Sequence, residues 1–393
     1  MTPTNAVDLR FSGLSQDEQT TLDQADRFAR EQMYPLSQKM DDEEWWPEQV
    51  FATMGDTGYF GIPIPENHGG AGMDLFTSGL VLQAFSRWNH ALALSWVAHE
   101  NLCLYNIYRN ANEEQRARYL PGLISGKTVG ALGLTEPGAG SDALGSMSTT
   151  ATRDGDDYLL NGTKIYITNG PVADVLLVYA KTEKAKGAKG ISAFIVEKNM
   201  PGFKVAQKLQ KMGFRGSQTG ELVFENCRVP VSHLVGEEHH GFKLIMANFN
   251  NERLFMAAQA YGFAQVCLEE ALDWARQRHT FGQALSERQV VRHKLMDMQM
   301  RIDTARSTVH ELAYRIEHQL GDPAQLVARI AMAKVLATQA MQFCADQALQ
   351  ILGGMGYMRG TRSERIYREV KVMMIGGGSE EIMKDLAARQ LGI

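Results

Sequence analysis

The sequence is poor in cysteine, has no long apolar run and carries no block of basic residues. Its cysteines lie far apart without a C-x-x-C pair, which argues against a disulfide framework, a metal site or a dithiol redox motif. We expect buried free thiols at Cys103, Cys227, Cys267 and Cys344. The formal net charge of -5 is spread along the chain, so nothing indicates a nucleic-acid partner. Runs of about 18 or more apolar residues are also missing, and no membrane-spanning helix is predicted.

The amino terminus shows no targeting pattern. Residues 1–13 include Asp8 and have neither the apolar core of a signal peptide nor an Arg-rich amphipathic pattern. We therefore expect a cytoplasmic protein. With 393 residues, of which 44% are hydrophobic and 22% charged, the chain can form two or three domains around sizeable cores.

Secondary-structure signals divide the chain into three parts. Residues 1–128 carry polar helix-start signals at 15–18 and Gly or Pro breaks at 63–70, and predict a helical domain. Residues 129–238 show short β-rich runs separated by turn residues such as Asp154-Gly155 and Asn161-Gly162, and predict a small antiparallel β domain. The predicted strands contain residues 158–160, 164–168, 175–179, 191–196 and 222–224.

Residues 239–393 return to a helical period and predict a helical bundle domain. Apolar residues that alternate steps of four and three form one seam along a long helix. After Asp322-Pro323, a second helix is rich in alanines, which let a neighbouring helix approach closely. The seam contains Val291, Leu295, Met298, Ile302, Ala305, Val309, Leu312 and Ile316, and the alanines are Ala328, Ala331, Ala333, Ala337 and Ala340.

The chain is thus expected to be mainly α with a central β domain. Strand–helix alternation, which would build a parallel sheet, is missing. Residues 138–143 match the pattern G-x-G-x-x-A, but they follow Glu136-Pro137 and precede hairpins, so a Rossmann interpretation is disfavoured. The glycines of this turn still allow a flat or phosphorylated ligand to approach the backbone closely.

The same turn belongs to a set of motifs that resembles the acyl-CoA dehydrogenase family. LTEPGAGSD at 134–142 is followed, in the family's order, by YITNG at 166–170, MGFRGS at 212–217, RHTFG at 278–282, QILGGMGY at 350–357 and IGGGSEE at 375–381. These motifs span nearly the whole chain. The resemblance implies the family's helix/β/helix fold, an FAD cofactor and α,β-dehydrogenation of an acyl-CoA thioester. It is greatest with isovaleryl-CoA dehydrogenases, next with long-chain acyl-CoA dehydrogenases.

The resemblance assigns two groups of residues to FAD. The first contacts the flavin ring, and the second holds the pyrophosphate and adenosine part, some of it across a subunit boundary, which implies a homotetramer built as a dimer of dimers. For Arg278, interaction with a helix C-terminus is the alternative. The first group is Leu132, Leu134, Thr135, Gly140, Ser141, Tyr166, Ile167 and Thr168; the second is Arg278, Phe281, Gln289, Gln350, Ile351, Leu352, Gly353, Gly354, Ser379, Glu380 and Glu381.

The catalytic base departs from the commonest family pattern. Many members carry it as a Glu at the position that is Gly377 here, whereas isovaleryl-CoA and long-chain acyl-CoA dehydrogenases place it in a Glu-Arg-Leu context on a helix. Glu252-Arg253-Leu254 matches that context, so the resemblance makes Glu252 the base that removes the Cα proton while a hydride leaves Cβ for flavin N5. The backbone N–H of Gly377 remains as the donor to the thioester oxygen.

The acyl pocket is expected along one helix face. Leu94, Ala98 and Leu102, spaced four apart, match the subfamily's pocket residues, although the same spacing is also typical of a core stripe. Met256 replaces a subfamily Leu, and its flexible thioether allows a longer or differently branched chain. The resemblance adds Ser141, Lys243, Asn250, Arg253 and Gly378 to the substrate contacts.

The sequence is also compatible with other functions. A long-chain or terpenoid-type branched substrate, or a flavin acyl-CoA oxidase or enoyl-CoA reductase of the same fold, is compatible with the motifs. The family's usual electron acceptor is an electron-transfer flavoprotein. A non-enzymatic helical interaction protein is the runner-up from another class, because helix pairs alone would produce the seam at 291–316.

Overall fold

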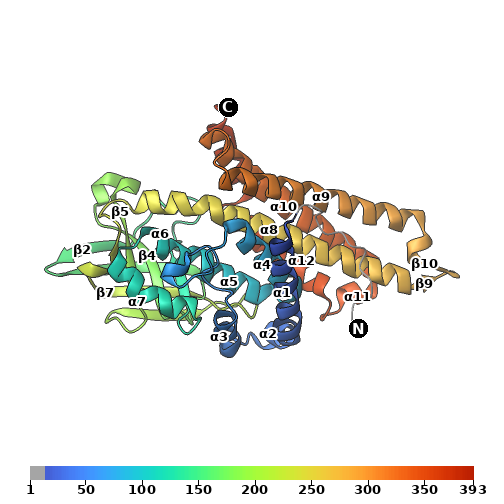
Figure 1. Ribbon diagram of the computed structural model, residues 1–393, viewed down its shortest axis with the longest axis horizontal. Coiled ribbons are helices and arrows are strands. Elements are labelled where there is room, and N and C mark those ends of the chain that lie inside the picture. Colours follow the sequence, from blue (N-terminus) through green and yellow to red (C-terminus); the bar gives the residue numbers. More distant parts are fainter. Residues whose placement is uncertain (1–13) are drawn as a thin grey trace.

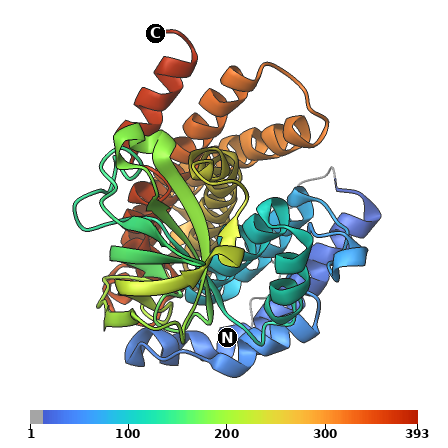
Figure 2. The ribbon, with the colours of Figure 1, turned by 90° about the vertical axis from the view of Figure 1, so that its left-hand side faces the viewer.

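The computed structural model describes residues 14–393, and one long helix runs along most of the molecule (Figure 1). Helices form the first and last parts of the chain, and a sheet lies between them in the sequence and beside both in space (Figure 2). This order confirms the predicted fold class. The predicted divisions after residues 128 and 238 fall in connecting segments and stay a proposal. Residues 1–13, on which the expectation about targeting rests, lie outside the described residues.

The N-terminal part is built from short helices around aromatic side chains. The first helix begins at a capping box, in which the Ser15 hydroxyl accepts from the Glu18 N–H and the Glu18 carboxylate accepts from the Ser15 N–H. The buried Trp96 indole donates to the Tyr59 carbonyl at 2.7 Å. The main elements are α1 (Gln16–Phe28), α2 (Ser37–Glu43), α3 (Glu48–Asp56), α4 (Leu75–Trp88), α5 (His90–Val97), the π-helix η4 (Ala98–Leu104), α6 (Tyr105–Asn110) and α7 (Glu113–Ile124).

The sheet is mostly antiparallel but not entirely so. Its strand order is β6-β7-β3-β2-β4-β5-β8, and β1 and β2 each pair with β4 in parallel. Parallel pairing needs a long connection, and the chain between β1 and β4 supplies it by forming β2 and β3 on the way. The strands are β1 (Gly130–Gly133), β2 (Thr150–Asp154), β3 (Asp157–Thr168), β4 (Val175–Lys181), β5 (Ile191–Glu197), β6 (Phe203–Lys208), β7 (Thr219–Pro230) and β8 (Leu234–Val235).

One predicted turn is wrong. Asp154-Gly155 does connect β2 to β3, with Gly155 in the left-handed region at φ 63°. Asn161-Gly162 instead lies inside β3, at an irregularity in its pairing with β7. The Asn161 side chain accepts from the Asn226 N–H at 2.8 Å, so a cross-strand contact that the sequence does not reveal keeps the strand continuous.

The C-terminal bundle follows the predicted periodicity. The predicted seam lies along α9, and Leu295, Met298, Ile302, Ala305, Val309 and Leu312 are buried. The predicted alanines of α10 are all buried. Among the described residues, the contact between α8 and α10 is the most extensive one between any two elements. The helices are α8 (Gly241–Gln277), α9 (Gln289–Glu317), α10 (Pro323–Leu352), α11 (Gly354–Tyr357), α12 (Arg362–Ile375) and α13 (Glu380–Gln390), and a hairpin of β9 (His279–Thr280) and β10 (Gln283–Ala284) precedes α9.

Other sequence expectations can be compared with the described part of the chain. All four cysteines are buried free thiols, as predicted. Between residues 14 and 393, no helix combines the length and apolar character needed to cross a bilayer. Within the same range, no cluster of three or more His, Cys, Asp or Glu side chains is arranged to hold a metal ion. The cytoplasmic location stays a prediction.

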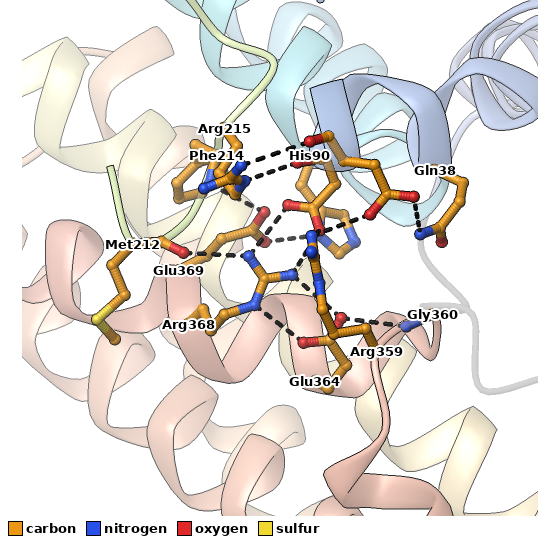
Figure 3. A network of polar contacts seen from close by, with 12 residues as sticks. Gln38, His90, Met212, Phe214, Arg215, Arg359, Gly360, Glu364, Arg368 and Glu369 are labelled. Atoms are coloured by element: carbon orange, nitrogen blue, oxygen red, sulfur yellow. Dashed lines mark hydrogen bonds and ion pairs between the residues drawn. The ribbon is translucent and has the colours of Figure 1, made fainter. Parts of the chain in front are cut away.

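A network of charges around the buried Asp41 joins the N-terminal helices to the C-terminal bundle (Figure 3). Asp41 of α2, 5% exposed, accepts from Arg368 at 2.7 and 3.0 Å and from Arg359 at 2.9 Å. Burial alone would raise the pKa of Asp41, but the two arginines outweigh burial and lower it. The Asp41 carboxylate therefore stabilises the fold above its ordinary pKa of 3.8, and this contribution is lost as the pH falls below that value.

We predict that Asp41→Ala lowers the free energy of unfolding by about 2 kcal/mol, because Arg368 loses its hydrogen bonds to one of its two carboxylate partners and keeps those to Glu364. The exposed neighbour Asp42, 3.0 Å from Arg359, is the matched control, and Asp42→Ala should cost less than about 1 kcal/mol. Urea denaturation of both variants measures the difference. Equal losses of unfolding free energy in the two variants would show that the Asp41 network does not stabilise the contact between the N-terminal helices and the bundle.

Candidate active site

Glu252 lies beside the turn that follows α12. A Cβ atom at Gly377 would lie 3.7 Å from Glu252 Oε1 and 2.6 Å from Met256 Sδ. Glu252 and Met256 are one turn apart on α8, so both side chains leave the same face of that helix. The half-buried carboxylate of Glu252 thus reaches the space into which a side chain at residue 377 would extend.

The turn itself is held by two cations. Gly377 and Gly378 have φ angles of 63° and 111°, a region in which glycine carries no Cβ penalty. Arg253 Nε donates to the Gly377 carbonyl at 3.2 Å. Lys334 Nζ, from α10, donates to the carbonyls of Met374 and Gly378 at 3.0 and 2.8 Å. Sequence reasoning missed Lys334; the available signal was one lysine within a run of small and apolar residues.

The electrostatics of this cluster suit a general base. Burial raises the pKa of Glu252, and the charges of Arg253 and Lys334 oppose that rise. Burial lowers the pKa of Lys334 to about 8, with Glu252 acting in the opposite direction. A carboxyl group with a raised pKa holds a proton more strongly than an exposed one, which is what proton abstraction from carbon requires.

One backbone donor and one side-chain donor in this cluster remain available to a ligand. The Gly377 N–H makes no hydrogen bond to the described part of the chain, because the helical pattern of α12 ends with the Gly376 N–H. Arg253 Nη1 is buried and lacks a hydrogen-bond partner between residues 14 and 393. A ligand oxygen bound here would satisfy donors that the protein leaves unpaired.

The predicted acyl stripe lies across a change of helix type. Leu94 is on α5, whereas Ala98 and Leu102 are on the π-helix η4, which the sequence did not predict. The Glu100 carboxylate accepts from the N–H groups of Gly61 and Ile62 at 2.8 and 3.0 Å, which anchors this wider helix. Four residues rotate by more than one full turn about the axis of an α-helix, but by less than one full turn about the axis of a π-helix. The change at Ala98 therefore brings Leu102 back toward the line of Leu94.

The remaining predicted substrate residues have different surroundings. Arg253 is buried, Asn250 and Gly378 are half-buried near Glu252, and Lys243 and Ser141 are exposed. Lys243 lies in the first turn of α8. Exposed groups at a distance from the base suit the polar part of a long ligand better than its reacting end.

The first predicted cofactor group comes together on the sheet. Ile165 N–H donates to the Thr135 carbonyl at 2.9 Å, which places the segment after β1 beside the end of β3. Tyr166 is 67% exposed with φ at 61°, a strained conformation of the kind that concentrates at binding sites. A Cβ atom at Gly140 would meet nothing within 4 Å, so this loop leaves its backbone open to a ligand. These features fit a flat ring with a polar edge.

A buried ion pair supports that loop. Lys164 Nζ donates to Glu136 Oε1 at 2.8 Å and to the Leu134 carbonyl at 3.0 Å, and the carboxylate also accepts from the Thr149 N–H at 2.9 Å. Burial alone would raise the pKa of Glu136, but Lys164 and the hydrogen bonds lower it to about 2. The charged Glu136 carboxylate therefore stabilises the fold above the ordinary Glu value of 4.5, and this contribution is lost as the pH falls toward 2. Burial lowers the pKa of Lys164 to about 8, so the cost of burying the lysine charge offsets part of this stabilisation.

Most of the second predicted cofactor group lies elsewhere. Arg278, Phe281 and Gln289 surround the β9–β10 hairpin, and the 350–354 segment ends α10 nearby, because Lys294 of α9 donates to Gln347 of α10 at 2.6 Å. Figure 1 shows this end of the molecule opposite the sheet. One chain therefore does not bring the two groups together. Ser379, Glu380 and Glu381 begin α13 directly after the Gly377 turn and lie apart from both.

Comparisons with known proteins cover almost the whole chain. Family models match residues 15–127 (acyl-CoA dehydrogenase, N-terminal domain), 131–227 (middle domain) and 239–392 (C-terminal domain). An acyl-CoA dehydrogenase of Bacillus subtilis is 42% identical over 93% of this chain and 95% of its own length. A mitochondrial isovaleryl-CoA dehydrogenase of Arabidopsis thaliana is 40% identical over 93% and 88%. The butyryl-CoA dehydrogenase structure from Megasphaera elsdenii has a TM-score of 0.93 at 34% identity, covering 98% of this chain and 100% of that chain.

The ion pair beneath the cofactor loop gives a test of cofactor binding. Lys164→Met should lower the free energy of unfolding by about 3 kcal/mol and weaken FAD retention, because the Glu136 carboxylate stays buried without its partner. Adding Glu136→Gln removes that charge and should recover most of both losses. Calorimetry and flavin absorbance after gel filtration measure the two effects. If the double variant retains no more FAD than the single one, the pair does not act by balancing charge.

Proposed function

The chain belongs to the acyl-CoA dehydrogenase family, FAD-dependent oxidoreductases that act on CH–CH groups, and we propose that it oxidises a short or medium branched acyl-CoA to the 2-enoyl-CoA with Glu252 as the base. The observation that carries this proposal is the 3.7 Å separation between Glu252 Oε1 and the Cβ position of Gly377. That separation supports a carboxylate delivered from α8 into the space where many relatives carry it on the turn.

In this proposal the residues of the chain perform three tasks. Glu252 accepts the Cα proton, a contribution of roughly 10²- to 10⁴-fold in rate. The Gly377 N–H donates to the thioester oxygen, where negative charge develops as the proton leaves. Leu94, Ala98 and Leu102 surround the acyl end and exclude water. When bound, FAD supplies the hydride acceptor for the hydrogen on Cβ, and the first cofactor group on the sheet would hold its ring.

We further propose a homotetramer with electron-transfer flavoprotein as the acceptor. The separation of the two cofactor groups within one chain supports a site completed by a second copy. Phe281 and Tyr357, 99% and 88% exposed at the end that carries Arg278, are large apolar surfaces of the kind that subunit interfaces cover.

The base is tested by Glu252→Gln, which keeps the side-chain shape but cannot take the proton. We expect this variant to bind acyl-CoA and to reduce its flavin at least roughly 10²-fold more slowly than the wild type, measured by anaerobic stopped-flow absorbance. The wild-type rate should rise with pH through a midpoint above the ordinary Glu value of 4.5, since burial raises the pKa of Glu252 and only the ionised form acts.

Glu269→Gln is the control, because Glu269 lies on the same helix and pairs with Arg87 at 3.0 Å. Near wild-type reduction by Glu252→Gln would place the base elsewhere. A transfer of the base to residue 377 needs three changes, Glu252→Gly, Gly377→Glu and Met256→Ala, because Met256 Sδ occupies the position of the new side chain.

The proposed acyl preference rests on the small side chain of Ala98 in the predicted acyl stripe. The relationship to an isovaleryl-CoA dehydrogenase and the small Ala98 support a methyl branch at C3. We predict a higher kcat/KM for isovaleryl-CoA or a slightly longer 3-methyl acyl-CoA than for palmitoyl-CoA. Ala98→Phe should reduce kcat/KM for the branched substrate about tenfold or more, since a buried methylene contributes about 0.8 kcal/mol. A steady increase with straight-chain length up to palmitoyl-CoA would contradict the branched substrate and favour a long-chain one.

A further inference from the structure

Lys334 is a fully buried lysine within a helix otherwise suited to close apolar packing. It lies on α10 between Ala333 and Val335, and its side chain is 0% exposed. Ala331 and Ala337, one turn away on either side, are also fully buried. Burial of an ammonium group is unfavourable unless the group is paired and hydrogen-bonded. The position of its partners therefore indicates what the charge does.

Both partners of Lys334 are backbone carbonyls around the Gly377 turn. The ammonium group donates to the Met374 carbonyl in the last turn of α12 and to the Gly378 carbonyl just beyond Gly377. Arg253 holds the carbonyl between them, that of Gly377, from the α8 side. Two cations from different helices thus fix three carbonyls of one short segment. The peptide that carries the Gly377 N–H, between Gly376 and Gly377, lies between these fixed carbonyls, so its movement is restricted on both sides.

The same ammonium group is one of the charges that act on Glu252. Arg253 of α8 and Lys334 of α10 both favour the ionised carboxylate, against the effect of burial. Glu380 of α13 acts on Lys334 from the other side, and it also accepts from Lys384 and Gln339 at 2.6 and 2.7 Å. A neutral amide could satisfy a carbonyl of the turn, but only a cation also stabilises the charge of Glu252.

We propose that Lys334 is a positioning residue for the dehydrogenation: it holds the turn that presents the Gly377 N–H to the thioester oxygen, and its charge favours the ionised form of Glu252. This inference rests on the proposed function. It assigns two effects to one side chain, and these effects separate experimentally. The geometry of the turn affects the rate at every pH, whereas the charge moves the pH at which the rate rises.

Two substitutions separate the effects in the FAD-loaded enzyme. Lys334→Met removes the donors and the charge, and it should slow flavin reduction by isovaleryl-CoA by about 10²-fold, the loss typical of a misplaced oxyanion donor. It should also shift the rising part of the pH profile to higher pH, because the pKa of Glu252 rises when a neighbouring cation is lost. Lys334→Gln keeps a donor, so it should recover part of the rate and still show the pH shift.

Lys211→Met is the matched control. Lys211 is a half-buried lysine that donates to the Ser217 carbonyl at 2.7 Å, away from Glu252, and its removal should leave both the rate and the pH profile unchanged. If Lys334→Met does not retain FAD, Lys334→Gln alone decides through the pH profile. A wild-type pH profile in the folded Lys334 variants would overturn the inference. Wild-type enzyme that no acyl-CoA reduces would instead refute the proposed function.

Discussion

The site depends on keeping one carboxylate charged where little water can reach it. Burial raises the pKa of Glu252, so burial alone disfavours the ionised form, which is the form that can accept a proton. Arg253 and Lys334 oppose this effect, and neither forms a direct ion pair with Glu252 among the described hydrogen bonds and salt bridges. Both cations instead donate to carbonyls of the Gly377 turn, so the groups that favour the charged form of Glu252 also fix the turn beside it.

The rest of the fold brings these groups together from distant parts of the sequence. Glu252 and Arg253 come from α8, Lys334 from α10 and the turn from the end of α12, and the small residues of α8 and α10 allow the close contact. Two other buried carboxylates have similar surroundings. Asp41 lies where the N-terminal helices meet the bundle, and Glu136 lies beneath the cofactor loop. In both cases the partner is a cation from a different element, which makes the contact specific to one arrangement of the chain.

Much of this arrangement could be predicted from the sequence where the signal is local or repeated. The seam of α9 and the alanines of α10 have the helical period. The Glu-Arg-Leu context and the glycine at 377 predict Glu252 as the base, and Glu252 lies beside the Gly377 turn. The missed features depend on contacts between distant residues. Asn161-Gly162 has the composition of a turn but pairs with Asn226; the π-helix depends on Glu100 meeting Gly61; and Lys334 reads as an ordinary charged residue until α12 ends beside it.

The central claim, that Glu252 removes the Cα proton, is tested most directly by separating that step from hydride transfer. 3,3-Dimethylbutyryl-CoA carries protons on Cα and none on Cβ, so it allows deprotonation but not oxidation. We predict that the FAD-loaded wild type exchanges the Cα protons of the analogue with deuterium oxide, as followed by proton NMR, and that Glu252→Gln, with the analogue bound, does not. Exchange by Glu252→Gln at the wild-type rate would contradict the assignment of the base.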